Sequence, residues 1–416
     1  MAKQSATDTS YAPRFLFSLT GDKDLMCLCT RPEQACVLVI YTGGTIGMVK
    51  DEKGALAPAP GILDKRLREF PQLHDEEYMK SHFGNCANPP LVLPPTGDKR
   101  RVVYSISEYR PLIDSSNVTV HDWVKIASDI EKNYELYDGF VILHGTDTMA
   151  YTSSALSFLL ECLGKSVIVT GSQIPIYEAR SDGRDNLLDA LVIAGNHVIP
   201  EVTLMFCNQL FRGNRVSKFS SSHLDAFASF NMAPLATIGI HIEISWELIL
   251  TPVEGKFYAH TTLSREVGML RLFPSITAEL VEAFLGEKMK GVVLQTYGSG
   301  NAPTNRKDII DAICRATARG VLIVNCSQCP HGDVDPAYVT GSELLKAGVI
   351  PGADMTPEAA LTKLSFVIAH TKWTIEEKKE KLQESLRGEL TPSSERGFTG
   401  PYNAASVAPW KQLLLR

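Results

Sequence analysis

Two threonines are the residues of this sequence best placed to do chemistry. Thr45 and Thr146 each follow a glycine at the end of a short apolar run, in Tyr41-Thr42-Gly43-Gly44-Thr45-Ile46-Gly47 and His144-Gly145-Thr146-Asp147-Thr148. Glycine permits a tight, open turn, so each hydroxyl can be presented at a strand end. A hydroxyl is a poor nucleophile until a neighbour removes its proton or stabilises the oxyanion. The candidates for that neighbour are Asp147, Lys218 and Tyr338.

Other interpretations of these and nearby residues stay open at this point. The Thr42-Gly43-Gly44-Thr45 segment could cradle a phosphate or be only a turn, although it lacks the Gly-Lys-Ser/Thr and Gly-x-Gly-x-x-Gly patterns of nucleotide-binding loops. Asp147 could simply cap a following helix. His144, at a strand end, is expected to be a hydrogen-bonded structural histidine. Arg212 and Arg215 could bind an anion or form surface ion pairs.

The elements that must position these residues form a repeating pattern. Short apolar runs rich in Val and Ile are typical of strands buried on both faces, and they occupy residues 36–41, 140–143, 167–169, 202–206, 292–294 and 321–324. Helical periodicity follows at 123–134 and 156–163; Thr119 and Asp122 resemble a capping box, and Leu163-Gly164 and Arg319-Gly320 look like helix ends. The alternation predicts a parallel α/β sheet, in which ligands bind beyond the carboxyl ends of the strands.

The same pass along the chain predicts five segments. Residues 1–35 form an N-terminal extension, 36–245 an N-terminal α/β domain, 246–266 a linker containing Trp246, Pro252 and Gly255, 267–392 a smaller C-terminal α/β domain, and 393–416 a weakly ordered tail. The charge run from Glu376 to Lys381 is expected to form a solvated helix face.

Composition excludes several classes of function. Among the 416 residues, 44% are hydrophobic, which suffices for a substantial core, and 41 basic against 47 acidic residues give a net charge of -6. A mildly acidic chain is a poor candidate for nucleic-acid binding. No apolar run is long enough to span a membrane, no secretion signal is visible, and the 9 cysteines are most simply reduced thiols, which together predict a cytoplasmic protein.

Metal and cofactor sites are not expected. Cys326-x-x-Cys329 could be a redox pair or half of a zinc site, but no second close cysteine pair of matching spacing accompanies it.

Six motifs taken together resemble the L-asparaginase family, in the family's order and over about residues 36–392. They are Tyr41-Thr42-Gly43-Gly44-Thr45-Ile46-Gly47-Met48, Asp114-Ser115-Ser116, His144-Gly145-Thr146-Asp147-Thr148-Met149-Ala150, Arg212-Gly213-Asn214-Arg215, Gly298-Ser299-Gly300-Asn301-Ala302-Pro303 and Leu386-Arg387-Gly388-Glu389-Leu390. The cytoplasmic, bacterial type I-like branch, which includes the vertebrate enzymes, is the most similar.

The resemblance implies a fold and an activity. The fold would be a flavodoxin-like N-terminal domain with a smaller Rossmann-like C-terminal domain, assembled as a homodimer or homotetramer. The activity would be hydrolysis of L-asparagine to L-aspartate and ammonia, without metal or cofactor.

The resemblance also implies roles for individual residues. Thr45 matches the nucleophile, which forms a β-aspartyl ester, and Thr146 and Lys218 match the groups that help to activate it. Asp147 matches the partner of the substrate ammonium. The remaining substrate-binding matches are Asp114, Ser115, Ser116 and Asn301. Tyr338 resembles the tyrosine that acts near the nucleophile in the vertebrate-like branch.

The residue types fit this chemistry independently of the resemblance. A zwitterionic substrate needs one negative charge and several donors, and an amide needs a nucleophile and a proton source. Three alternatives remain: a broader amidase or esterase that also accepts glutamine, a catalytically silent amino-acid sensor, and a nucleotide-binding module.

Overall fold

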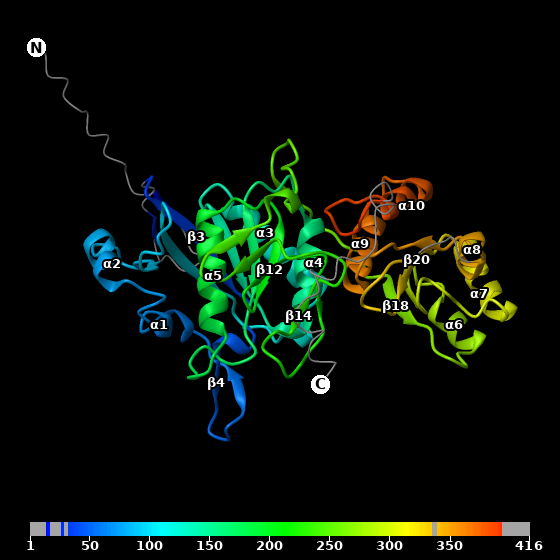
Figure 1. Cartoon of the computed structure of the whole chain (residues 1–416), viewed down its shortest axis with the longest axis horizontal. Coiled ribbons are helices and arrows are strands. Elements are labelled where there is room, and N and C mark those ends of the chain that lie inside the picture. Colours follow the sequence, from blue (N-terminus) through cyan, green and yellow to red (C-terminus); the bar gives the residue numbers. More distant parts are fainter. Residues whose placement is uncertain (1–13, 17–25, 29–31, 335–338, 393–416) are drawn as a thin grey trace, which may run out of the picture.

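Two separate sheets organise the chain (Figure 1). The computed structural model describes residues 14–16, 26–28, 32–334 and 339–392. The larger sheet has 9 strands in the order β16-β15-β12-β11-β10-β8-β3-β7-β6, and its central strands β7, β3, β8, β10 and β11 run parallel. The predicted α/β class, with a largely parallel first sheet, is confirmed.

Four strands of the larger sheet, those that begin at residues 34, 139, 166 and 202, lie close to predicted apolar runs, and the other five were not predicted. The nine strands are β3 (Gln34–Tyr41), β6 (Leu91–Val92), β7 (Arg101–Glu108), β8 (Gly139–Leu143), β10 (Ser166–Thr170), β11 (Val202–Phe206), β12 (Gln209–Arg212), β15 (Ala236–Ile238) and β16 (Ile242–Ile244). Burial on both faces explains the unbroken apolar character of the central strands.

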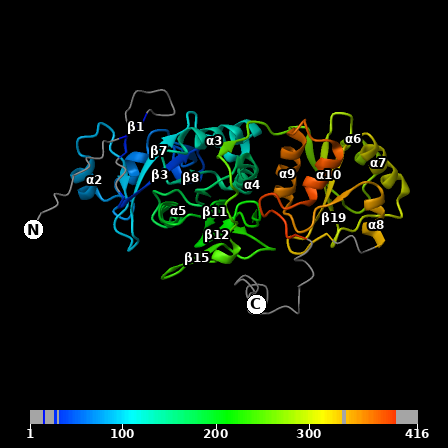
Figure 2. The same cartoon turned by 90° about the horizontal axis from the view of Figure 1, so that it is seen from above.

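Helices cover both faces of this sheet, and the alternation of side chains along β3 shows how. Val37 and Val39 pack with α5 (Gly183–Asn196) and α1 (Leu63–Leu67), whereas Leu38 and Ile40 pack with α3 (Val120–Asn133) and α4 (Met149–Leu159). Figure 2 shows α3 and α5 on opposite sides of the sheet. The N-terminal domain is therefore a three-layer structure whose strand ends are free to carry loops.

The C-terminal domain surrounds a second sheet in which all strands are parallel, in the order β18-β19-β20-β21. Its strands are β18 (Val267–Arg271), β19 (Gly291–Thr296), β20 (Leu322–Ser327) and β21 (Ile350–Pro351). Its helices are α6 (Ala278–Phe284), α7 (Lys307–Ala318), α8 (Val339–Lys346), α9 (Pro357–Ala369) and α10 (Ile375–Gln383). Helices α6 and α7 pack in one core, and α9 and α10 in another.

Helices α4 and α9 lie side by side between the two sheets, as both views show (Figures 1 and 2). Phe158 of α4 is fully buried against Phe366 of α9. The Ser154 and Thr362 hydroxyls of the same helices hydrogen-bond at 2.7 Å. The two domains are thus joined by a packed helix pair that contains a buried polar contact.

Shorter elements complete the described structure. They are β1 (Arg14–Leu16), β2 (Met26–Leu28), β4 (Met48–Lys50), β5 (Leu56–Pro58), α2 (Glu76–Phe83), β9 (Leu160–Glu161), β13 (Ser217–Lys218), β14 (Phe227–Ala228) and β17 (Tyr258–Ala259). Strands β1 and β2 pair within the predicted N-terminal extension, and β17, within the predicted linker, pairs with β9. The division of the chain at 246–266 stays a prediction.

Some of the predicted helix boundaries are confirmed and others are wrong. The capping box of Thr119 and Asp122 is confirmed, as are the end of α7 before Arg319-Gly320 and the exposed charge run on α10. The prediction of one helical face through Leu163 is wrong, because α4 ends at Leu159 and Leu160 begins β9. Within the described residues, no helix is long and apolar enough to cross a membrane.

Candidate active site

Three tight turns meet at the carboxyl ends of the first sheet. They are η1 (Thr45–Gly47) after β3, η2 (Ser115–Asn117) after β7, and η3 (Thr146–Thr148) after β8. A Cβ atom on Gly44 would lie 2.5 Å from the backbone nitrogen of Gly145, and a Cβ atom on Gly145 would overlap the Ser115 hydroxyl. Only glycine fits at both positions, and Gly44 also has a positive φ of 94°. These contacts bring the Thr45 and Thr146 turns together with the Ser115 turn.

Lys218 joins Thr146 and Asp147 into one hydrogen-bonded group. Its Nζ donates to the Thr146 hydroxyl at 2.8 Å and to the Asp147 carboxylate at 2.7 Å. The side chain of Lys218 is 17% exposed and that of Asp147 is 67% exposed. The lysine therefore joins a buried hydroxyl on one side to a solvent-facing carboxylate on the other, at the protein surface.

The alternative that Asp147 only caps a helix is wrong. The residue before α4 is Thr148, which makes no side-chain cap bond, and the Asp147 carboxylate accepts from Lys218 instead. The carboxylate is therefore held by an ion pair from a strand 71 residues away in sequence.

Gln173 is a site residue that the sequence reasoning did not select. Its amide oxygen accepts from the Thr146 hydroxyl at 3.1 Å, and its amide nitrogen donates to the His223 carbonyl at 3.1 Å. The Thr146 hydroxyl thus accepts from Lys218 and donates to Gln173, which fixes its orientation. Its position three residues after β10, at the same sheet edge, was the available signal.

The Asp114–Ser116 segment shapes the third turn. The Asp114 carboxylate accepts from both the backbone N–H and the hydroxyl of Ser116, each at 2.9 Å. Ser115 is buried, and its carbonyl accepts from the Thr148 hydroxyl at 2.7 Å. Asp114 therefore orders the Ser116 side chain, and Ser115 ties this turn to the turn that carries Thr146.

The other two predicted residues are placed differently. Asn301 lies in the loop after β19 of the C-terminal domain, where its backbone N–H donates to the Tyr297 carbonyl at 2.8 Å. This loop belongs to the second sheet, beyond the α4 and α9 pair that separates the two sheets (Figure 1). Tyr338 lies outside the described residues.

His144 is a structural residue, as predicted. Its imidazole is 1% exposed and hydrogen-bonds the Gly145 carbonyl at 2.7 Å and the Thr152 hydroxyl at 3.0 Å. Burial lowers the pKa of His144 to about 4, so the ring is neutral at physiological pH. The imidazole therefore stabilises the turn that carries Thr146 through its buried hydrogen bonds.

Arg212 and Arg215 neither bind an anion nor form surface pairs, so both open interpretations are wrong. Each guanidinium is buried. Arg212 pairs with Glu201 at 2.5 Å, and Arg215 pairs with Asp354 at 2.8 Å and donates to the Gly388 carbonyl at 2.7 Å. Arg212 also donates to the Gly388 carbonyl at 3.4 Å, so both arginines help to fasten the N-terminal domain to the C-terminal one.

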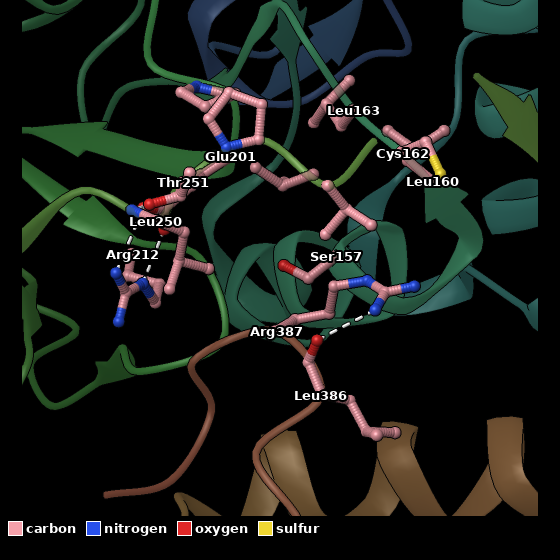
Figure 3. A pocket seen from close by; sticks show the side chains of 14 residues that line it. Ser157, Leu160, Cys162, Leu163, Glu201, Arg212, Leu250, Thr251, Leu386 and Arg387 are labelled. Atoms are coloured by element: carbon pink, nitrogen blue, oxygen red, sulfur yellow. Dashed lines mark hydrogen bonds and ion pairs between the residues drawn. The ribbon is translucent and has the colours of Figure 1, made fainter. Parts of the chain in front are cut away.

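A cavity of about 60 Å³ lies beside the Arg212 pair (Figure 3). Its wall includes Glu201, Cys162 and Arg387, and the Arg387 guanidinium donates to the Leu386 carbonyl and pairs with Glu161. None of the residues predicted to be catalytic or to bind the substrate lines it. This cavity is a packing feature of the domain contact, separate from the three turns.

Metal chemistry has no candidate among the described residues. No group of three or more His, Cys, Asp or Glu side chains there could hold a metal ion. Cys326 is buried within β20, and Cys326 and Cys329 are both free thiols.

Comparison with known proteins agrees with this arrangement along most of the chain. Residues 36–250 match the asparaginase N-terminal family, and residues 266–382 match the glutaminase/asparaginase C-terminal domain. An L-asparaginase of Dirofilaria immitis is 50% identical over 86% of this chain and 61% of its own length, and a human 60 kDa lysophospholipase is 48% identical over 89% and 64%. This chain therefore spans about three fifths of the length of these two relatives.

Other relatives match from end to end. L-asparaginase 1 of Escherichia coli is 46% identical over 86% of this chain and 99% of its own length. The crystal structure of L-asparaginase I from Vibrio cholerae superposes with a TM-score of 0.74 at 42% identity, over 86% of this chain and 99% of that one. The matched segments, the shared fold and the three adjoining turns lead to one conclusion: this chain belongs to the asparaginase family.

Proposed function

We propose that the protein hydrolyses L-asparagine to L-aspartate and ammonia, with Thr45 as the nucleophile. The observation that carries the proposal is the Lys218–Thr146 hydrogen bond of 2.8 Å beside the turn that presents Thr45. A hydroxyl nucleophile needs a nearby group through which its proton can leave. The lysine and the second threonine supply that path without a metal ion.

The reaction proceeds in two steps that use the same groups. The Thr45 oxygen attacks the side-chain amide carbon, the bond from carbon to nitrogen breaks, and the threonine proton passes to the departing nitrogen, which leaves as ammonia. Water then attacks the resulting β-aspartyl ester, which releases aspartate and restores the hydroxyl. The backbone N–H of Thr146 is a donor for the oxyanion, a contribution of about 3–4 kcal/mol per donor.

Charge complementarity supports an amino-acid substrate. Asp147 presents a carboxylate that is 67% exposed, so it can pair with a substrate ammonium while it keeps Lys218 in place. Ser115 and Ser116, on the adjoining turn, supply donors for the substrate carboxylate, and Asp114 orders the Ser116 side chain. One negative group and several donors match a small zwitterion.

Two further parts of the proposal concern residues away from the three turns. Tyr338 is proposed to act beside Thr45, and Asn301 to contact the substrate. Because Asn301 lies in the C-terminal domain, the proposed homodimer or homotetramer would let a second copy contribute it. The proposed compartment is the cytoplasm, as expected from the cysteine content.

The direct test is ammonia release by the purified protein and by a Thr45→Ala variant. Wild-type protein should release ammonia from L-asparagine, and Thr45→Ala should lose turnover but keep its fold, judged by circular dichroism, and part of its substrate affinity. Near-normal turnover in Thr45→Ala would refute the nucleophile assignment. Asparagine binding by wild-type protein without ammonia release would favour the sensor instead.

A broader hydrolase is the second candidate, because the human relative is named a lysophospholipase. The kcat/KM values for asparagine, glutamine and a lysophospholipid would separate the activities. One methylene changes pocket affinity by only about 1–3 kcal/mol, so some glutamine turnover is compatible with an asparaginase. Calorimetric titration with ATP and NAD tests the nucleotide-binding alternative.

A further inference from the structure

The C-terminal domain reaches the strand that carries Lys218. The Ser217 hydroxyl of β13 donates to the Glu358 carboxylate, on the first turn of α9, at 2.9 Å. Successive side chains of a strand point to opposite faces. The contacts agree with this rule, since Ser217 faces α9 and Lys218 faces Thr146 and Asp147.

Strand β13 has little backbone support of its own. It contains two residues, which pair with Ala228 and Phe227 of β14, and the next backbone bond runs from the Phe219 N–H to the Ala226 carbonyl. A ladder this short leaves the strand free to shift unless side chains hold it. The Ser217–Glu358 hydrogen bond is a side-chain contact on the face opposite Lys218.

Helix α9 also contacts the other element that places the lysine's partners. Helix α4 begins directly after Thr146, Asp147 and Thr148, and the Ser154–Thr362 bond of 2.7 Å ties α4 to α9. One helix of the C-terminal domain thus touches both β13 and α4. The contact with β13 adjoins Lys218 directly, whereas Ser154 of α4 lies eight residues after Thr146.

The surroundings of the Glu358 carboxyl group favour its hydrogen bond with Ser217. Glu358 is partly buried, and Ser217 and Thr356 hydrogen-bond its carboxyl group. Burial raises the pKa of this carboxyl group, while those bonds lower it. Because the group is an acceptor in either protonation state, the bond from Ser217 survives protonation.

We propose that Glu358 is a positioning residue, which holds Ser217 on one face of β13 and thereby keeps the Lys218 ammonium within reach of Thr146 on the other face. The inference rests on the proposed function, in which Lys218 assists Thr45. It assigns to the C-terminal domain a part in catalysis that needs no contact with the substrate.

Kinetics of Glu358→Ala, Ser217→Ala and their double variant test the proposal. A displacement of about 1 Å near the reacting groups costs up to about 100-fold in rate. Each single variant should therefore lower kcat by about 10-fold or more and change KM less than about 3-fold, and the double variant should be no slower than the slower single one. Glu358→Gln keeps an acceptor oxygen and should retain most of kcat. An unchanged kcat in Glu358→Ala, or multiplying losses in the double variant, overturns the proposal.

Thr362→Val is the matched control, because it removes a buried bond between α9 and the N-terminal domain that does not involve β13. It should lower the thermal midpoint about as much as Glu358→Ala does while kcat stays near the wild-type value. An equal loss of kcat in Thr362→Val would mean that the domain contact as a whole matters, and the specific role of Glu358 would be refuted.

Chemical labelling of Lys218 separates this inference from the proposed function. The rate of acetylation by an N-hydroxysuccinimide ester, followed by peptide mass spectrometry, reports on the lysine without any turnover. Faster labelling of Lys218 in Glu358→Ala, with other lysines unchanged, supports the positioning role even if wild-type protein releases no ammonia. Unchanged labelling overturns it.

Discussion

The sharpest prediction concerns Thr146→Val, which removes a hydroxyl and preserves the shape of the side chain. The hydroxyl accepts from Lys218 at 2.8 Å and donates to Gln173 at 3.1 Å, and the residue is 6% exposed. A bond to a charged group contributes about 1.5–3 kcal/mol and a neutral one about 0.5–1.5 kcal/mol. Lys218 keeps its bond to Asp147 and Gln173 is partly exposed, so we expect a loss of unfolding free energy near the low end, about 1–2 kcal/mol.

The expected effect on turnover is larger than the effect on stability. A positioned proton-transfer group contributes about 100- to 10,000-fold to rate, which corresponds to about 3–5 kcal/mol of activation free energy. Thr146→Val should therefore lower kcat at least about 100-fold. A domain with about 5–15 kcal/mol of stability tolerates the accompanying loss and remains folded.

The assay combines ammonia release under saturating asparagine with urea unfolding of the same preparation. Thr170→Val is the control, because its hydroxyl is also buried and donates to the Met205 carbonyl at 2.8 Å without contacting Lys218. Both variants should lose similar stability, but only Thr146→Val should lose turnover. If kcat in Thr146→Val stays within about threefold of wild type, the hydroxyl has no part in proton transfer and the reasoning fails.

Three further predictions concern His144, Asp354 and Gln173. Burial lowers the pKa of His144 to about 4, so between about pH 6.5 and 4 the unfolded state binds a proton that the folded state does not. The free energy of unfolding should therefore fall by about 3 kcal/mol over this range. Urea unfolding of His144→Gln at several pH values should lack this dependence on pH, and an identical dependence would contradict the assignment. Burial alone would raise the pKa of Asp354, but the charge of Arg215 and hydrogen bonds to the carboxylate outweigh burial and lower this pKa. Asp354 therefore stabilises the fold above about pH 4, and this stabilisation is lost as the pH falls further. Asp354→Asn should cost about 3–5 kcal/mol at pH 7, and a change below about 1 kcal/mol would show that the buried pair matters little. Gln173→Leu should lower kcat about 10-fold with little change in thermal midpoint, since it frees the hydroxyl of Thr146 to rotate; an unaltered kcat would remove Gln173 from the site.

Several features could be predicted because their causes are local. The strands that begin at residues 34, 139, 166 and 202 are short apolar runs followed by turn residues, and burial on both faces requires that composition. The Thr119–Asp122 capping box closes within one helical turn. His144 was recognisable as structural because a strand end inside a parallel sheet buries its side chain.

The failures involve partners that are distant in sequence. Helix α4 stops at Leu159 because Leu160 and Glu161 pair with β17, about a hundred residues further on, and no local signal reveals that pairing. Arg215 could be interpreted as an anion-binding residue or as part of a surface ion pair because its partner, Asp354, lies 139 positions away. Gln173 was not predicted as a site residue, because its amide matters only through the hydrogen bond from Thr146, which the sequence does not reveal.

The amino-acid order alone determined which residues are chemically capable and at which strand ends they stand. Glycines before Thr45 and Thr146 allow tight turns whatever the remainder of the chain does, because that freedom is a property of the residue itself. Only the folded molecule decided which of those groups meet. Parallel strands gather turns from positions 45, 115 and 146 at one edge, and Lys218 receives its orientation from β13, which the second domain holds through Glu358. Hydrogen bonds and ion pairs act over a few ångströms, so distances in space, which a linear order does not contain, assign the partners.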